Sequence, residues 1–150
     1  MNASAGWLLF ALAGGMALAV QAGLNGGLGR LLGHPLWATL ASLTVSVATV
    51  VPVMLLLRLK LPEAADAARA PWWQWLGGVL GALYVTAALA ATPRLGVTTA
   101  VAAVITGQLM MSLVLDHFGL LGLARQPIDL SRIAGVVLLV AGLFLIRGWR

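Results

Sequence analysis

The sequence predicts an all-α integral membrane protein that crosses the bilayer five times. Hydrophobic residues make up 61% of the 150 residues, charged residues make up 9%, and the apolar residues form five long runs. Soluble domains carry about 25% charged residues, and a helix needs ~20 apolar residues to cross the hydrocarbon core. The chain therefore has room for five or six spans joined by short turns. We expect a single membrane domain over residues 1–150.

The first apolar run predicts a helix over residues 6–28. Residues 11–13, Ala-Leu-Ala, resemble a signal-peptide cleavage site, but no basic residue precedes them and the apolar stretch continues through Leu24. This pattern favours a retained helix over a cleaved leader. The second run predicts a helix over residues 37–57, shortly after Pro35. Proline is common at the first position of a helix.

The next two runs predict helices over residues 73–91 and 97–115. Tryptophans gather at the start of the earlier helix, as in the aromatic belts that lie at headgroup level. Thr92 and Pro93 follow its end. Because proline lacks the backbone N–H that a helix interior uses, we expect this helix to stop there.

The last run predicts a helix over residues 131–147, and it is the shortest span. Only the 14 residues 133–146 are free of charge. Arg132 and Arg147 must therefore extend along the helix to reach the headgroups. Either Asp129 or Ser131 is suited to cap the start of this helix.

The basic residues are divided almost equally between the two sides of the membrane. Five helices place the termini on opposite sides, with five Lys/Arg on the N-terminal side and four on the other. The first group is Arg58, Lys60, Arg69, Arg125 and Arg132, and the second is Arg30, Arg94, Arg147 and Arg150. Orientation follows an excess of Lys/Arg in short loops, so a chain without one is able to insert both ways. Two copies would then pair antiparallel about an axis in the membrane plane; the alternative is one orientation with a separate partner.

The net charge of +5 does not predict nucleic-acid binding, because the basic residues are singles and pairs at the ends of apolar runs. There they meet lipid headgroups. The chain has no cysteine, and His34 and His117 fall at opposite membrane faces. We find no metal-ligand cluster, no nucleophile with a base, and no phosphate-binding glycine loop. We therefore expect neither a metal, nor a cofactor, nor an enzyme.

Polar side chains inside the predicted helices are the main functional signal, because such groups must be paired or face a cavity in hydrocarbon. The candidate substrate-binding residues are Gln21, Asn25, Ser42, Ser46, Tyr84, Gln108 and Ser112. Those at helical spacing share faces: Gln21 with Asn25, Ser42 with Ser46, and Gln108 with Ser112. The helix rise places Gln21, Tyr84 and Gln108 within ~6 Å of their helix midpoints. Transporters hold their substrates at this depth.

Each of these residues also has a structural interpretation. The amides and Tyr84 can join helices through hydrogen bonds worth about 0.6 kcal/mol each, and a helical hydroxyl can bond its own helix carbonyl. Asp116 shares a face with Gln108 and Ser112. It either carries protons during transport, or caps its helix or pairs with a basic residue such as Arg125.

Several short motifs together resemble a known family. They are Gln21-x-x-x-Asn25, Gly81-x-x-Tyr84-Val85, Pro93-x-Leu95-Gly96, Gly107-Gln108-x-x-x-Ser112 and Asp116-His117-Phe118-Gly119. Over most of its length the chain resembles the bacterial YdcZ-like proteins, which are small five-helix members of the drug/metabolite transporter superfamily. The resemblance implies a multi-pass protein of the bacterial inner membrane that forms half of an inverted-repeat, ten-helix transporter. Its partner would be a second copy or a paralogous half-transporter.

The resemblance also implies that the first four helices line the pathway and the fifth supports the dimer. Small multidrug exporters of the same superfamily carry a proton-exchanging glutamate in the first helix. This chain has Gln21 and no carboxylate there, and an amide does not titrate. Proton coupling, if present, would fall to Asp116.

Together these observations predict an antiparallel homodimer that moves a small polar solute by alternating access. Two other functions remain open at this point. A non-transporting scaffold or partner subunit would use the same polar residues to join helices. A passive dual-topology channel would conduct without saturation.

Overall fold

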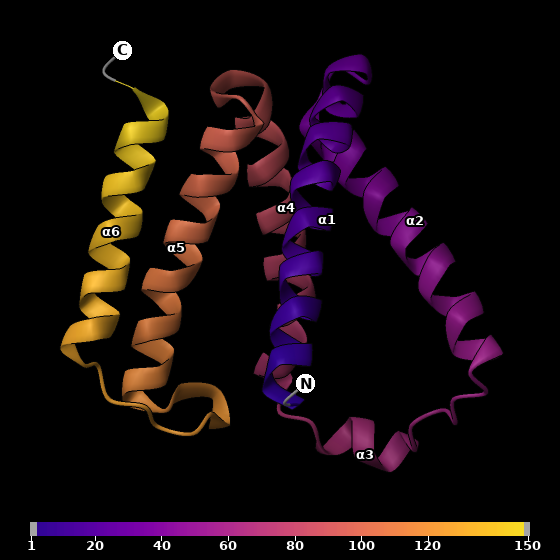
Figure 1. Cartoon of the computed structure of the whole chain (residues 1–150). Helices are drawn as coiled ribbons and strands as arrows, with labels where there is room; N and C mark the ends of the chain where they lie inside the picture. The colour runs from indigo at the N-terminus through magenta and orange to yellow at the C-terminus, as the bar shows by residue number, and fades with distance from the viewer. Residues whose placement is uncertain (1–2, 149–150) are drawn as a thin grey trace. The chain divides into compact units, whose positions relative to one another are not determined.

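The computed structural model describes residues 3–148, and within them the chain is helical. The elements are α1 (Ala3–Leu31), α2 (Pro35–Leu56), α3 (Ala64–Arg69), the 3₁₀ turn η1 (Trp72–Trp75), α4 (Leu76–Leu95), α5 (Val97–Phe118), the 3₁₀ turn η2 (Leu120–Gly122) and α6 (Leu130–Arg147) (Figure 1). Five segments are long and apolar enough to cross a membrane: Ala5–Leu31, Pro35–Leu56, Trp72–Leu95, Val97–Phe118 and Leu130–Arg147. The prediction of an all-α membrane protein with five spans is confirmed.

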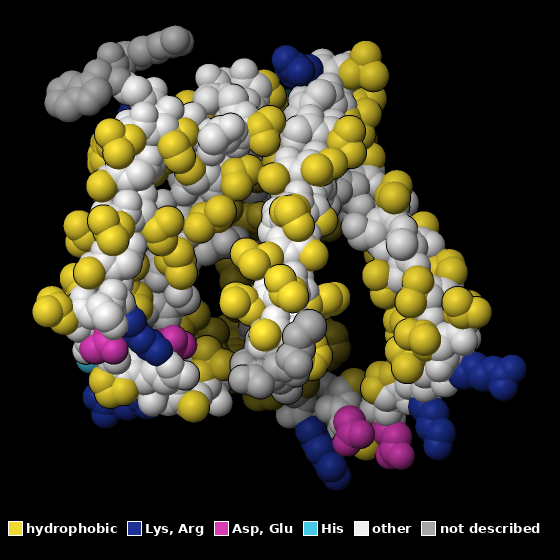
Figure 2. Space-filling view, viewed as in Figure 1, with side chains coloured by type: hydrophobic (Ala, Val, Ile, Leu, Met, Phe, Trp, Pro, Cys, Tyr) yellow, Lys and Arg dark blue, Asp and Glu magenta, His cyan; other side chains and the backbone are white. Residues whose placement is uncertain are grey.

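The side chains are distributed as a bilayer requires. Hydrophobic side chains cover the flanks of the helices, whereas the Lys, Arg, Asp and Glu side chains gather at helix ends and in the connecting segments (Figure 2). Large residues such as Phe10, Leu24 and Leu138 are at least 70% exposed on the isolated chain. A soluble protein rarely exposes so much contiguous apolar surface. These flanks therefore face lipid or another protein.

Contacts between residues divide the chain into two compact units. The terminal unit comprises the residues up to Ala19 and those from Arg94, and the central unit comprises Val20–Pro93. Helix α1 contributes its first part to the terminal unit and its last part to the central unit. The chain passes between the units again near the end of α4.

In the central unit, α1 and α2 meet at a tight turn. Gly33 adopts a φ of 78°, which favours glycine, and Nδ1 of His34 accepts a hydrogen bond from the Leu36 amide at 3.2 Å. Pro35 begins α2, as predicted. A Cβ on Gly29 would lie 3.5 Å from the Cα of Pro35. This is an ordinary van der Waals distance, so α1 and α2 are in contact at Gly29 but alanine would also fit there.

The helical segments before and within α4 differ in part from the prediction. The tryptophan-rich start forms the 3₁₀ turn η1, and α4 continues past Pro93 to Leu95. Pro93 lies in the last turn, where the helix loses only one backbone hydrogen bond. Gly96, with a φ of 79°, follows the end of α4. A short helix, α3, also forms in the polar segment expected to be a loop, because its sequence Ala-Ala-Asp-Ala-Ala-Arg is rich in strong helix formers.

In the terminal unit, α5 and α6 lie side by side and run antiparallel (Figure 1). Gly119 ends α5 in the left-handed conformation, with a φ of 62°. The carboxylate of Asp129 caps α6 by accepting hydrogen bonds of 2.8 Å from the Arg132 amide and the Ser131 hydroxyl. Of the two predicted capping residues, Asp129 is therefore the cap. These hydrogen bonds lower the pKa of Asp129 below its ordinary value of 3.8.

Candidate functional site

A polar pocket lies between α1 and α2 in the central unit. Its volume is about 450 Å³, within the usual range of ~300–1,000 Å³ for small-molecule sites. The lining residues are Gln21, Asn25 and Leu28 from α1, and Ala41, Ser42, Val45, Ser46, Thr49 and Val50 from α2. Four of the seven predicted site residues, Gln21, Asn25, Ser42 and Ser46, therefore line one pocket.

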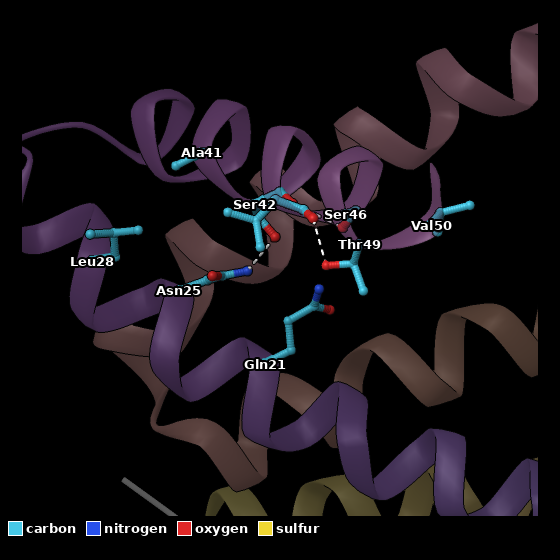
Figure 3. A pocket seen from close by; sticks show the side chains of 9 residues that line it. Gln21, Asn25, Leu28, Ala41, Ser42, Ser46, Thr49 and Val50 are labelled. Carbon is cyan, nitrogen blue, oxygen red and sulfur yellow. Dashed lines mark hydrogen bonds between the residues drawn. The ribbon is translucent and has the colours of Figure 1, made fainter. Parts of the chain in front are cut away.

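One side-chain hydrogen bond joins the two walls of this pocket. The Nδ2 of Asn25 donates to the Oγ of Ser42 at 3.0 Å (Figure 3). Gln21 lies one helical turn before Asn25, and its side chain points from α1 toward Thr49 on α2 (Figure 3). Within residues 3–148 the Gln21 amide has no hydrogen-bond partner in this structure. Gln21 is therefore the polar group most available to a ligand.

The hydroxyls farther along α2 bond to their own helix. Ser46 Oγ donates to the Ser42 carbonyl at 2.9 Å, and Thr49 Oγ1 donates to the Val45 carbonyl at 2.8 Å. The alternative of own-helix bonding is thus correct for both residues. Their oxygen lone pairs still line the pocket. Thr49 follows Ser46 by three residues, and this helical spacing is the signal that could have added it to the predicted site.

Thr39, Ser42, Ser46 and Thr49 form a hydroxyl stripe along one face of α2, and Thr39 makes a different contact from the others. It is buried, and its Oγ1 lies 2.9 Å from the Oγ1 of Thr86 on α4. Each Oγ1 also lies within hydrogen-bonding distance of a carbonyl of its own helix, Thr39 at 3.2 Å from Pro35 and Thr86 at 2.8 Å from Ala82. Because each hydroxyl has one proton, one of the two threonines donates to the other and the other donates to its own helix. The stripe on α2 is therefore divided into a buried contact with α4 at one end and a pocket wall beyond it.

The pocket is centred on the middle of α2, whereas on α1 it lies in the second half of the helix, from Gln21 onward. Ser46 is half a residue from the midpoint of α2 and Gln21 is four residues from the midpoint of α1. At ~1.5 Å per residue, these offsets are about 1 Å and about 6 Å. A solute held between Gln21 and Ser46 would lie near the bilayer midplane, where transporters place their substrates.

The remaining predicted residues lie elsewhere. Gln108 and Ser112 line a larger, mostly apolar pocket of about 850 Å³ in the terminal unit, together with Leu12 and Met16 of α1. Ser112 Oγ donates to the Leu109 carbonyl at 2.9 Å. Tyr84 is half-buried on α4 and lines neither pocket. None of these three residues lines the polar pocket.

Asp116 forms an ion pair at the end of α5. Its Oδ2 lies 3.3 Å from Nη1 of Arg132, and each side chain is about one third exposed, at 35% and 31%. The other terminal nitrogen of Arg132 donates to the Gln126 side chain. Arg125 instead donates to the His117 carbonyl at 3.0 Å. Arg132 is the partner because antiparallel packing brings the first turn of α6 beside the last turn of α5.

The described residues offer no metal centre, since residues 3–148 contain no group of three or more His, Cys, Asp or Glu placed to hold an ion. The polar pocket is lined instead by amides and hydroxyls. These groups bind by hydrogen bonding and do not supply a nucleophile with a base. The geometry suits reversible binding of a small solute.

Five membrane-crossing helices and a neutral polar pocket at mid-depth define a small multi-pass membrane protein with a candidate solute site. The sequence matches, over residues 6–145, the family model described as "Putative inner membrane exporter, YdcZ". The chain belongs to this YdcZ family, and it is a multi-pass protein of the inner membrane.

A similar curated protein is the inner membrane protein YdcZ of Escherichia coli strain K12. It is 32% identical over 75 residues, which cover 50% of this chain and 50% of that protein. The matched region thus spans about half the length of this relative. No solved structure matches the chain.

Proposed function

We propose that this protein is a membrane transporter that moves a small polar solute by alternating access. The observation that carries the proposal is the polar pocket between α1 and α2, lined by Gln21, Asn25, Ser42, Ser46 and Thr49. Polar groups at mid-depth are costly in hydrocarbon unless they are paired or face a cavity. Here most of them line a cavity, and Gln21 extends into it (Figure 3). The family description, an inner membrane exporter, supports the same class of function.

We further propose that the working unit is an antiparallel homodimer of ten membrane-crossing helices. Each copy contributes five of them. The nearly equal division of basic residues, five against four, favours insertion in both orientations. Two oppositely inserted copies would place two polar pockets about an axis in the membrane plane. A paralogous half-transporter is the alternative partner.

Counterflow in proteoliposomes tests transport. Purified protein is reconstituted, vesicles are loaded with unlabelled solute, and entry of labelled solute is followed. A transporter gives saturable uptake and a transient overshoot above the equilibrium level. A passive channel gives linear flux without overshoot, and a scaffold gives no flux above that of empty vesicles. Either of these last two outcomes contradicts the proposal.

Topology is tested separately at Ala65, an exposed residue of α3. A cysteine introduced there into this cysteine-free chain should react with a membrane-impermeant maleimide on both sides of the membrane in comparable amounts. Three lysines added next to Arg150 should shift the labelling to one side, because added basic charge fixes orientation. Labelling from one side only in the unmodified chain would contradict the antiparallel homodimer.

A further inference from the structure

The polar pocket has a consistent hydrogen-bonding character that bears on which solutes it accepts. Its polar side chains are two amides and three hydroxyls, and none of its nine lining residues, all within the described part of the chain, is ionisable. The other lining residues are aliphatic. A charged solute would meet no opposite charge here to offset the hydration that it loses, which is unfavourable. The lining thus favours uncharged solutes.

The α2 wall presents acceptors at Ser46 and Thr49, whereas Ser42 keeps a hydroxyl proton that it is able to donate. The hydroxyl protons of Ser46 and Thr49 are already donated to carbonyls of α2, so each oxygen offers only its lone pairs to a ligand. Ser42 Oγ already accepts a hydrogen from Asn25. A ligand that contacts Ser46 and Thr49 must therefore donate hydrogen bonds to both.

The α1 wall complements this pattern. The Gln21 amide offers two N–H donors and one carbonyl acceptor, and its side chain points toward Thr49 (Figure 3). Ser46 and Thr49 are three residues apart, which places such side chains about 5–6 Å apart on a helix face. A chain of three to four hydroxyl-bearing carbons spans about this distance.

Resting on the transport proposed above, we propose that the solute is an uncharged, hydroxyl-rich molecule such as a small polyol. Two of its hydroxyls donate to Ser46 and Thr49, and Gln21 bonds its remaining oxygens. The same neutral pocket discriminates against organic cations and against carboxylates. Methylation of the solute's hydroxyls removes the donors and abolishes recognition.

Labelled erythritol is the probe, and it is used in two assays on the full-length protein. Equilibrium dialysis measures its binding to the purified protein, and proteoliposomes measure its initial rate of uptake. Unlabelled competitors in excess are xylitol, the tetramethyl ether of erythritol, choline and lactate. Only xylitol should compete, because only it is uncharged and carries hydroxyl donors.

The chain offers a matched control for the pocket variants. Thr49→Val and Ser46→Ala remove acceptor oxygens from the pocket, whereas Thr44→Val removes a hydroxyl of α2 that bonds its own helix in the same way but lies outside this pocket. Loss of one net hydrogen bond corresponds to about a two- to tenfold weaker affinity. We expect this loss for the Thr49 and Ser46 variants and none for the Thr44 variant.

The outcomes separate this inference from the proposed function. Erythritol binding without saturable uptake would contradict transport and support the inference about the pocket. Saturable transport of choline or lactate, with no binding of erythritol, would leave transport standing and overturn the inference. Equal competition by the tetramethyl ether, or an equal loss in the Thr44 variant, would also overturn it. No binding and no flux of any of these solutes would contradict both.

Discussion

Replacement of Gly26 by alanine should destabilise the central unit, although alanine is the better helix former. A Cβ at this position would lie 3.2 Å from Cγ2 and 3.3 Å from Cβ of Thr92 on α4. Both distances are shorter than ordinary van der Waals contacts of about 3.5–4.0 Å. The Thr92 methyl cannot simply rotate away, because its Oγ1 donates to the Ala88 carbonyl at 2.8 Å and this bond fixes the rotamer.

Two opposing terms determine the size of the effect. Gly→Ala in a helix gains up to about 1 kcal/mol, whereas an added carbon in a closely packed contact costs about 1–3 kcal/mol. The expected net change for Gly26→Ala is a loss of about 0–2 kcal/mol. Gly27 provides the control, because no described atom lies within 4 Å of a Cβ built there. Gly27→Ala should therefore be neutral or stabilising.

The assay is reversible unfolding of the purified protein in mixed micelles by added SDS, followed through tryptophan fluorescence. Thr92→Ser removes the methyl and keeps the hydroxyl, so the double variant Gly26→Ala with Thr92→Ser should recover most of the lost stability. This recovery is measured against Thr92→Ser alone. A Gly26→Ala protein as stable as the Gly27→Ala protein would refute the close contact between α1 and α4.

Three further changes test other parts of the structure by the same unfolding assay. Thr39→Val breaks the buried contact with α4 and should cost about 0.6–1 kcal/mol, whereas exposed Thr44→Val should stay within about 0.5 kcal/mol. Asp116→Asn breaks the ion pair with Arg132 and should lower stability while leaving the pH dependence of transport unchanged; normal stability with a lost pH response would contradict this. The hydrogen bonds that lower the pKa of Asp129 stabilise the folded state at pH values above 3.8, the ordinary pKa of this group. This stabilisation should be lost as the pH falls through the lower pKa of the folded state. The Asp129→Ala variant should lack this part of the pH dependence of stability.

The sequence was sufficient to predict the features that depend on local pattern. Five apolar runs predicted five spans because each must satisfy its backbone within a helix in lipid. Pro35 and Asp129 were predicted at helix starts, and both are found there. The short helix α3 was missed because its polar surroundings suggested a loop, although its own residues favour a helix.

The contacts between helices were less predictable. Helical spacing identifies which residues share a face, but it does not say which neighbour that face meets. Thr39 and Ser46 are seven residues apart and share a face of α2, yet Thr39 contacts Thr86 on α4 and Ser46 lines the polar pocket. In the same way, Gln108 has the polarity and depth expected of the site but lines a different, mostly apolar pocket. Only the packing of the helices within each unit separates these roles.

The positions of the carboxylates separate solute binding from any proton coupling. Asp116 pairs with Arg132, Asp129 caps α6, and Asp66 pairs with Arg69 at 3.8 Å in α3. None of these groups lines the polar pocket. Asp116 therefore belongs to the junction between α5 and α6 and not to the lining of the pocket. A proton-driven cycle in this protein would have to work through movement of these helices, because the pocket itself contains no group that exchanges a proton for a solute.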